Sequence, residues 1–196
     1  MIQLSERLLA MEESATIAMA KKSRELKSQG KDVISLSLGE PDFHTPEFIK
    51  DAAIEALAQN YTTYTPVPGY DDLRESIAHK FLRDNNLTYT KDQIVVSTGA
   101  KQSIANLVLS LINPGDEVII PAPYWVSYLE IVKVAEGIPV VIAAGIDKDF
   151  KITGADLEAA ITPKTKLLMF STPCNPTGSV YSKEELQDLA RVLAKY

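Results

Sequence analysis

Cysteine is almost absent from this sequence, which has a single one, Cys174, among 196 residues. One cysteine cannot form a disulfide within the chain, so the disulfide-stabilised classes of secreted domain are excluded and a reducing compartment is expected. Long apolar runs are missing too. The longest, residues 138–146, is broken by a proline and a glycine. It is far shorter than the roughly 20 residues that a membrane-spanning helix needs.

Positive charge is also in deficit, because Lys and Arg number 20, Asp and Glu number 26, and the formal net charge is −6. This balance argues against nucleic-acid binding as the main function. Near the N-terminus, Glu6, Glu12 and Glu13 interrupt the stretch in which a signal peptide requires consecutive apolar residues. We therefore expect a soluble, cytoplasmic protein with neither a nucleic acid nor a membrane as its partner.

The sequence does contain enough apolar material for a core. The hydrophobic fraction is 45% and the charged fraction 23%, as in ordinary globular proteins. A chain of this size can bury about 70% of the surface that it exposes when unfolded. The length predicts one domain, or one domain and part of another.

Residues 93–196 alternate between short β-branched runs and amphipathic stretches. This alternation predicts an α/β fold with a mainly parallel sheet and helices on both of its faces. An Asn-Pro-Gly-Asp turn is expected before the second strand. The expected strands lie at 94–96, 118–120, 140–142 and 166–171, and the expected helices at 104–111, 124–135, 156–161 and 182–196, the last opened by a capping box of Ser182 and Glu185.

Residues 1–90 have a different pattern, typical of an arm and part of a second domain. The expected elements are a helix from Ser14 to a stop at Gly30, a strand over 33–38, a helix with Pro46 as its first residue, an aromatic loop over 60–70 and a helix over 73–82.

Three loops follow predicted strands, at the edge of an open α/β sheet where ligands bind. In residues 97–101, backbone N–H groups at a helix start form an anion site to which Lys101 adds charge; the alternative is a plain tight turn. In residues 121–125, the single tryptophan, Trp125, either stacks on a flat ligand or packs in the core. In residues 171–178, two prolines and a glycine favour a rigid loop that presents Asn175 to a ligand over a purely structural one.

Taken together, the motifs resemble those of one family, the pyridoxal-phosphate aminotransferases of fold type I, class I, and especially the bacterial aspartate aminotransferase branch. The resemblance covers nearly the whole chain. It implies that residues 1–45 form an N-terminal arm and a small-domain segment, and that residues 46–196 form the first part of the large domain that binds the cofactor. The matching segments, in the family's order and spacing, are Gly39–Phe43, Tyr61–Gly69, Gly99–Gln102, Pro123–Tyr128 and Asn175–Gly178.

The resemblance implies that pyridoxal 5′-phosphate is the cofactor and that no metal is needed. Gly99, Ala100 and Lys101 would lie at the cofactor phosphate. Trp125 would stack on the pyridine ring, and Asn175 would form a hydrogen bond to the ring hydroxyl oxygen. The bond between Asn175 and Pro176 would be cis, as it is in the family.

The implied reaction moves an amino group between aspartate and 2-oxoglutarate, so the partners are an amino acid and a 2-oxo acid. The residues implied at the substrate are Gly39, Lys101, Trp125 and Asn175. Gly39 would line the site of the substrate carboxylate, and Lys101 would meet the distal carboxylate of a dicarboxylic substrate. Tyr64 would reach the cofactor phosphate of a second subunit, which implies a homodimer.

The family's chains are about twice as long as this one, and the resemblance implies that essential groups lie beyond Tyr196. They are the lysine that forms the Schiff base, the aspartate at the pyridine nitrogen and the arginine that binds the substrate α-carboxylate. We therefore expect residues 1–196 to be inactive alone. The strand at residues 93–97 would not neighbour the next three strands, which would leave sheet edges unpaired.

Some features depart from the family's pattern or leave alternatives open. Many members of the family carry asparagine where this chain has Cys174, while His44 and His79 match no motif and are interpreted as surface or loop residues.

Other enzymatic interpretations are an aromatic, alanine or prephenate aminotransferase, or a carbon–sulfur lyase. A non-enzymatic interpretation is the ligand-sensing domain of a transcription regulator, but no helix-turn-helix precedes the aminotransferase-like part.

Overall fold

The computed structural model describes residues 3–11, 15–36, 39 and 41–196. The chain divides into two compact units. The first consists of residues 1–37 and 104–196, and the second of residues 38–103.

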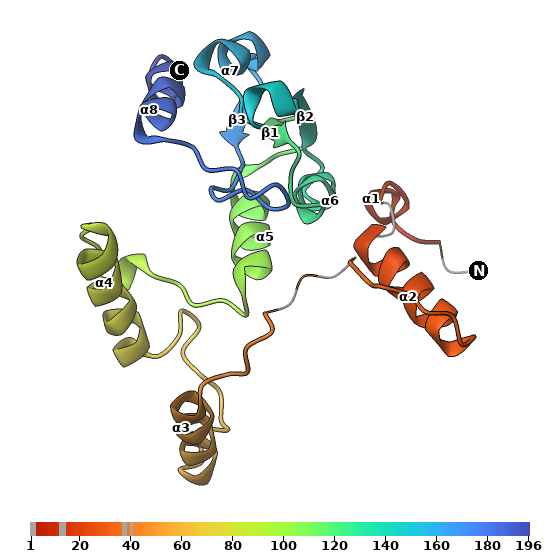
Figure 1. Ribbon diagram of the computed structural model, residues 1–196. Coiled ribbons are helices and arrows are strands. Elements are labelled where there is room, and N and C mark those ends of the chain that lie inside the picture. Colours follow the sequence, from red (N-terminus) through yellow and green to blue (C-terminus); the bar gives the residue numbers. More distant parts are fainter. Residues whose placement is uncertain (1–2, 12–14, 37–38, 40) are drawn as a thin grey trace. The chain divides into compact units, whose positions relative to one another are not determined.

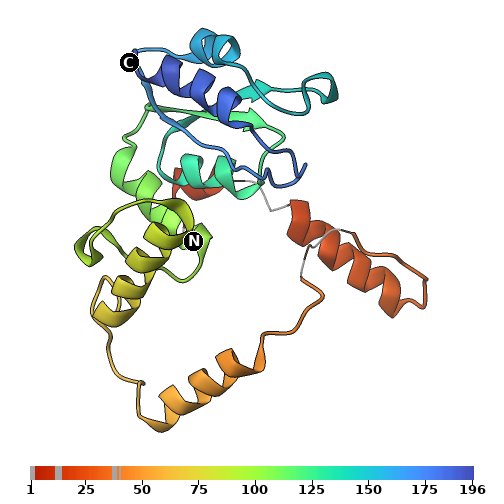
Figure 2. The same cartoon turned by 60° about the vertical axis from the view of Figure 1, so that its left-hand side comes forward.

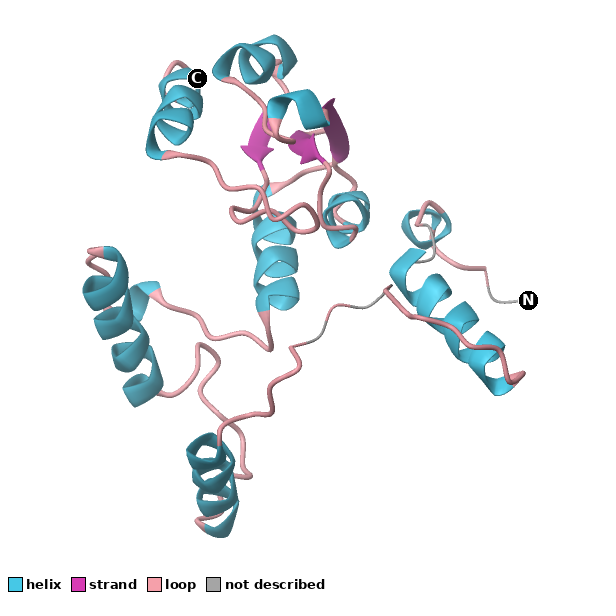
Figure 3. Cartoon of the chain, viewed as in Figure 1, coloured by secondary structure: helices cyan, strands magenta, loops and turns pink. Residues whose placement is uncertain are grey.

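The first unit contains a three-stranded parallel sheet of β1 (Glu117–Ala122), β2 (Ile138–Ala143) and β3 (Thr165–Leu168) (Figures 1 and 3). The strand order is β2-β1-β3, with Ile119 opposite Val140 on one side and Leu168 on the other. The central strand is buried from Val118 to Pro121, as expected for a parallel strand with both faces covered. The predicted mainly parallel α/β fold is confirmed.

Helices cover both faces of this sheet (Figure 2). Successive side chains of β1 point to opposite faces, so Val118 and Ile120 contribute to one apolar cluster and Ile119 to the other. The first cluster includes residues of α5 (Ala100–Leu111) and α6 (Ser127–Val134), and the second includes residues of α7 (Gly154–Ala160) and α8 (Lys183–Leu193). A short 3₁₀ helix, η2 (Ile146–Lys148), follows β2.

Local sequence signals set several boundaries in this unit. The turn before β1 forms as predicted: Asp116 N–H donates to the Asn113 carbonyl at 3.0 Å, and Gly115 adopts a φ of +87°. That backbone is the left-handed conformation that a type II turn requires at its third residue, where glycine is favoured. The capping box of α8 also forms, with Glu185 N–H donating to Ser182 Oγ at 3.2 Å.

Three elements are shorter than predicted. The helix expected over 124–135 begins only at Ser127, the strand expected over 166–171 ends at Leu168, and the last helix ends at Leu193. In the first two cases, the excess residues belong to loops at the carboxyl ends of β1 and β3. Their backbones bend away to form the loops described below.

The N-terminal part of the first unit contains α1 (Glu6–Leu9) and α2 (Ala15–Ser28). Gly30 has the predicted left-handed backbone, with φ +79°, while the predicted cap at Ser14 lies outside the described residues. The strand expected over 33–38 is wrong for the described residues 33–36, and residues 37–38 lie outside them. Ile34 is 85% exposed and Leu36 90% exposed, so this β-branched run has neither a neighbouring strand nor a core to bury its side chains.

The second unit contains α3 (Glu47–Ala58), α4 (Asp71–Asn85) and the short η1 (Lys91–Gln93). The aromatic stretch between α3 and α4 is a loop, as predicted, and Pro46 immediately precedes α3 instead of opening it. The strand predicted over 94–96 is wrong, since the described residues there form no ladder. Val96 N–H instead donates to the Pro68 carbonyl at 2.9 Å, which joins this segment to the loop before α4.

Within the described parts of the chain, no helix is both long enough and apolar enough to cross a membrane.

Candidate functional site

In the second unit, the tight turn before α5 carries the first group of predicted site residues. Gly99 has φ +85°, and its N–H donates to the Ser97 carbonyl at 2.8 Å. A side chain at Gly99 would meet no atom within 4 Å, so it is the backbone conformation that favours glycine here. Ala100 and Lys101 form the exposed first turn of α5. A helix start of this kind attracts anions because its first N–H groups point out of the helix.

In the first unit, Trp125 lies in the loop between β1 and α6. Its ring meets Tyr128 edge to face, with centroids 5.6 Å apart and an interplanar angle of 87°. The tryptophan is half-buried and packs against the first apolar cluster. The structure therefore supports packing of the indole against the core, and stacking on a ligand stays a prediction.

Residues 171–178 form the second loop of this unit, and its turn is defined by backbone hydrogen bonds. Gly178 N–H donates to the Cys174 carbonyl at 2.8 Å, and Cys174 N–H donates to the Ser179 carbonyl at 2.9 Å. Asn175 N–H donates to Ser171 Oγ at 3.2 Å, while the Asn175 residue is exposed. The bond between Asn175 and Pro176 is cis, as predicted. Asn175 thus lies on a closed turn that leaves its side chain accessible.

Cys174 joins these two loops of the first unit. Its thiol donates to the Pro123 carbonyl at 3.4 Å, so the loop after β1 contacts the loop after β3. Beside this contact lies a cavity of about 10 Å³, lined in part by Tyr124, Phe170 and Ser171. It has at most about the volume that one water molecule requires. The loops that carry Trp125 and Asn175 are thereby held together at the carboxyl ends of neighbouring strands.

The remaining predicted site residues lie in the second unit. Tyr64 is fully exposed in the aromatic loop, and Gly39 is also exposed. Glu40, within the first matching segment, lies outside the described residues. The structure brings together Gly99, Ala100 and Lys101 in one turn, and the loops of Trp125 and Asn175 in one contact. The roles assigned to all these residues stay predictions.

The sequence analysis missed two residues that organise the Asn175 loop. Ser171 accepts a hydrogen bond from the Asn175 backbone, and Tyr181 places its N–H 3.0 Å from Thr172 Oγ1. A serine at a strand end and a tyrosine before a helix are common, so neither carried a distinctive signal.

His44 and His79 are exposed, which agrees with their interpretation as surface or loop residues. In the part of the chain that the structure describes, no group of three or more His, Cys, Asp and Glu is placed to hold a metal ion.

Chemically, the residues of the two units suit different kinds of ligand group. A helix start with an adjacent lysine favours a phosphate or a carboxylate. A partly exposed indole and an exposed amide, on two loops that contact each other, favour a flat ring that carries a hydrogen-bonding oxygen. Neither part contains a nucleophile with a neighbouring base, so covalent chemistry is not evident from these residues by themselves.

Comparison with known proteins identifies the chain's relatives. Residues 31–196 match the family described as aminotransferase class I and II. An aspartate/prephenate aminotransferase of Nitrosomonas europaea is 53% identical over 195 residues, which are 100% of this chain and 49% of that protein. An aspartate aminotransferase of Bacillus sp. (strain YM-2) is 49% identical over 189 residues, 96% of this chain and 48% of that protein.

Solved structures agree with these sequence matches. The aspartate aminotransferase of Thermus thermophilus with maleate has a TM-score of 0.95 at 46% identity, covering 100% of this chain and 51% of that one. An alanine aminotransferase of Pyrococcus furiosus has a TM-score of 0.93 at 30% identity, covering 99% of this chain and 50% of that one. The chain therefore spans about half the length of the relatives it matches, and its fold alone does not decide the amino acid.

Proposed function

Because this chain belongs to the class I and II aminotransferase family, we propose that, in a protein of its relatives' length, it contributes to transfer of an amino group from aspartate to 2-oxoglutarate. The observation that carries this proposal is the 53% identity, over 195 residues, to a relative named for aspartate and prephenate. A second relative named for aspartate alone supports it at 49% identity. The more distant alanine enzyme, at 30% identity, supports the fold more than the substrate.

The donor groups of the candidate site fit pyridoxal phosphate as the cofactor. Bound there, it supplies an electron sink for the bond that breaks at the amino acid's α-carbon. The first turn of α5, with Gly99 and Ala100, would bind the phosphate through backbone N–H groups, and the Lys101 ammonium would balance its negative charge. The left-handed backbone at Gly99 opens the turn so that the phosphate can approach the main chain.

Trp125 and Asn175 would orient the cofactor ring. The exposed part of the indole would cover one face of the ring and exclude water from it. The exposed amide of Asn175, on the closed turn of residues 174–178, would donate a hydrogen bond to the ring oxygen. Fixing both groups before binding lowers the entropic cost of holding the ring in one orientation.

The proposal also assigns residues to the substrate. In this proposal Gly39 lines the site of the α-carboxylate, and the Lys101 ammonium binds the distal carboxylate of aspartate. A lysine that serves mainly the cofactor phosphate is the alternative, and the two roles differ in their effect on substrate choice. Trp125 and Asn175 would border the substrate as well as the ring.

The whole enzyme is proposed to be a cytoplasmic homodimer. Tyr64 is fully exposed, which supports its proposed role of reaching a second subunit's cofactor phosphate. Residues 1–45 are proposed as arm and small-domain segment, and residues 46–196 as the first part of the large domain. None of the lysines in residues 1–196 is proposed to attach the cofactor covalently.

The substrate is tested by initial rates of the intact enzyme with saturating pyridoxal phosphate. The amino donors are aspartate, glutamate, alanine and phenylalanine, and prephenate is tested as an acceptor. We expect kcat/KM for the two dicarboxylic donors to exceed that for alanine by at least about tenfold, as one charge-assisted hydrogen bond provides. A preference for alanine or phenylalanine over aspartate contradicts the proposal.

A further inference from the structure

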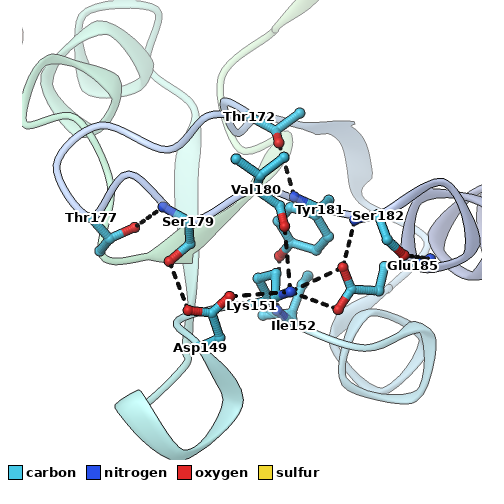
Figure 4. Close-up of polar contacts among 10 residues, drawn as sticks. All are labelled: Asp149, Lys151, Ile152, Thr172, Thr177, Ser179, Val180, Tyr181, Ser182 and Glu185. Carbon is cyan, nitrogen blue, oxygen red and sulfur yellow. Dashed lines mark hydrogen bonds and ion pairs between the residues drawn. The ribbon is translucent and has the colours of Figure 1, made fainter.

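Lys151, which the proposed function does not use, lies at the centre of a polar cluster in the first unit (Figure 4). Its ammonium lies 2.8 Å from one oxygen of Glu185 and 3.2 Å from one oxygen of Asp149. It also donates to the Val180 carbonyl at 3.4 Å. The Lys151 side chain is only 16% exposed, so these contacts are less weakened by water than those of an ordinary surface pair.

The charges of this cluster are complementary at neutral pH. Hydrogen bonding to Glu185 raises the pKa of Lys151, and the same contact lowers the pKa of Glu185, which also accepts a hydrogen bond from the Ser182 N–H. One partly buried ammonium is therefore matched with two carboxylates. The cluster joins the segment after β2 to the first turn of α8, some 30 residues further along the chain.

Contacts lead from the cluster to the Asn175 loop. The second oxygen of Asp149 accepts from the Ser179 hydroxyl at 3.3 Å (Figure 4). The Ser179 N–H donates to Thr177 Oγ1 at 3.2 Å, and the Ser179 carbonyl accepts from Cys174 N–H at 2.9 Å. Cys174 is the residue before Asn175, so this path runs from Lys151 through Asp149 and Ser179 to the closed turn.

Tyr181 provides a second connection between the same segments. Its buried hydroxyl accepts from the Ile152 N–H at 2.8 Å. Its own N–H donates to Thr172 Oγ1 at 3.0 Å, on the outgoing limb of the loop (Figure 4). Asp149, Lys151 and Ile152 therefore hold the returning limb, residues 179–181, at three consecutive residues. The Asn175 turn is exposed, and residues 179–181 connect it to the rest of the first unit.

We propose that Lys151 is a positioning residue, which fixes residues 179–181 and through them the orientation of the Asn175 amide. The inference rests on the proposed function of Asn175, because only a group that meets the cofactor ring needs such a fixed orientation. Lys151 itself touches neither cofactor nor substrate in this proposal. Its part in the reaction is indirect, through the backbone of the loop.

The experiment compares backbone hydrogen exchange in the intact protein and in two variants. Lys151→Met removes the ammonium and keeps an unbranched side chain. Lys148→Met is the matched control, because Lys148 precedes it by three residues and pairs with Asp156 at 3.3 Å, outside the cluster of Figure 4. In Lys151→Met we expect the amides of Cys174, Gly178 and Tyr181 to exchange about tenfold faster, because their hydrogen bonds lie in the turn and the limb that the ammonium would no longer fix.

The amides of β1 serve as the internal reference for global stability. They should keep their protection in both variants, and the control should leave the loop unchanged. The inference is overturned if the loop keeps its protection in Lys151→Met, or if β1 and the loop lose protection equally. If Lys151→Met does not fold, Ser179→Ala removes only the link to Asp149, and it should speed exchange at Gly178 several-fold. Unchanged exchange there also overturns the inference.

Kinetics of the intact enzyme give a second readout. Lys151→Met should lower kcat about tenfold at nearly unchanged KM for aspartate, because a misoriented ring affects the chemical step more than substrate binding. Lys151→Arg should restore both kcat and loop protection, since a guanidinium can pair with both carboxylates. Normal aspartate turnover in Lys151→Met, together with faster exchange of the loop amides, overturns the positioning role of Lys151 and leaves the proposed function intact. An enzyme that does not use aspartate overturns the proposed function and leaves the exchange result intact.

Discussion

At the scale of single residues, the proposed substrate preference depends most on Lys101. It lies in the first turn of α5, two residues after the left-handed Gly99. A phosphate and a distal carboxylate are both anions, and either would be attracted to an ammonium at a helix start. Distinguishing the two roles therefore requires a change of substrate charge.

Lys101→Ser in the intact enzyme should lower kcat/KM for aspartate and glutamate by about ten- to a hundredfold more than for alanine, because only the dicarboxylates lose a charge-assisted hydrogen bond. Steady-state rates with the three donors measure this ratio, and alanine is the control within the same variant. An equal loss with all donors, together with weaker pyridoxal phosphate binding, would assign Lys101 to the phosphate instead.

Gly69 sets the path of the chain between the aromatic loop and α4. Its φ is +99°, and a Cβ there would lie 2.7 Å from Cγ2 of Val96. Gly69→Ala should therefore lower the free energy of unfolding by about 1–3 kcal/mol, from backbone strain and overpacking. Urea denaturation measures the change. Gly39→Ala is the matched control, since a Cβ at Gly39 would meet no atom within 4 Å. If Gly39→Ala lowers the free energy of unfolding as much as Gly69→Ala does, this explanation is refuted.

At the scale of elements, α8 combines a capping box with the charged cluster at its first turn. Glu185 accepts from the Ser182 N–H and pairs with Lys151, and Leu189 and Val192 bury the helix against the second apolar cluster. Contact with Lys151, and then with the Ser182 backbone, lowers the pKa of Glu185. The folded state therefore favours the ionised carboxylate more than the unfolded state does.

This linkage predicts a pH-dependent effect of Glu185→Gln. A lowered folded-state pKa contributes stability above the ordinary glutamate pKa of about 4.3, and the contribution disappears as the pH falls through the folded-state value. Tm should therefore be lower in the variant at pH 7, and the difference should shrink toward pH 3. Glu184→Gln is the control at the neighbouring exposed position. A difference from the parent protein that persists unchanged to pH 3 contradicts the linkage.

Elements with local signals could be predicted from the sequence. The Asn113–Asp116 turn and the Ser182 cap each depend on residues within a few positions, and both form as predicted. The strands predicted at 33–38 and 94–96 do not form in the described residues, because a β-branched run becomes a strand only beside a partner. The same limit applies to the site. The loops of Trp125 and Asn175 follow from their place after β1 and β3, whereas the turn at residues 97–101 follows no strand. The pairing of Lys151 with Glu185 spans 34 residues and has no local pattern.

At the scale of the whole molecule, large apolar side chains remain exposed on α3 of the second unit. All the residues of α3 are outside the core, and Phe48 and Ile54 are 74% and 65% exposed. An apolar helix face of this kind requires a partner surface. Together with relatives of about twice this length, it supports the proposal that the chain acts as part of a larger assembly.

The central claim is that these residues supply only part of an aspartate aminotransferase site. Its most direct test is formation of oxaloacetate from aspartate and 2-oxoglutarate, with added pyridoxal phosphate, by residues 1–196 alone and by the intact enzyme at equal concentration. We predict turnover by the intact enzyme and none above the blank by residues 1–196. Turnover by residues 1–196 alone, or an intact enzyme that does not use aspartate, would contradict the account.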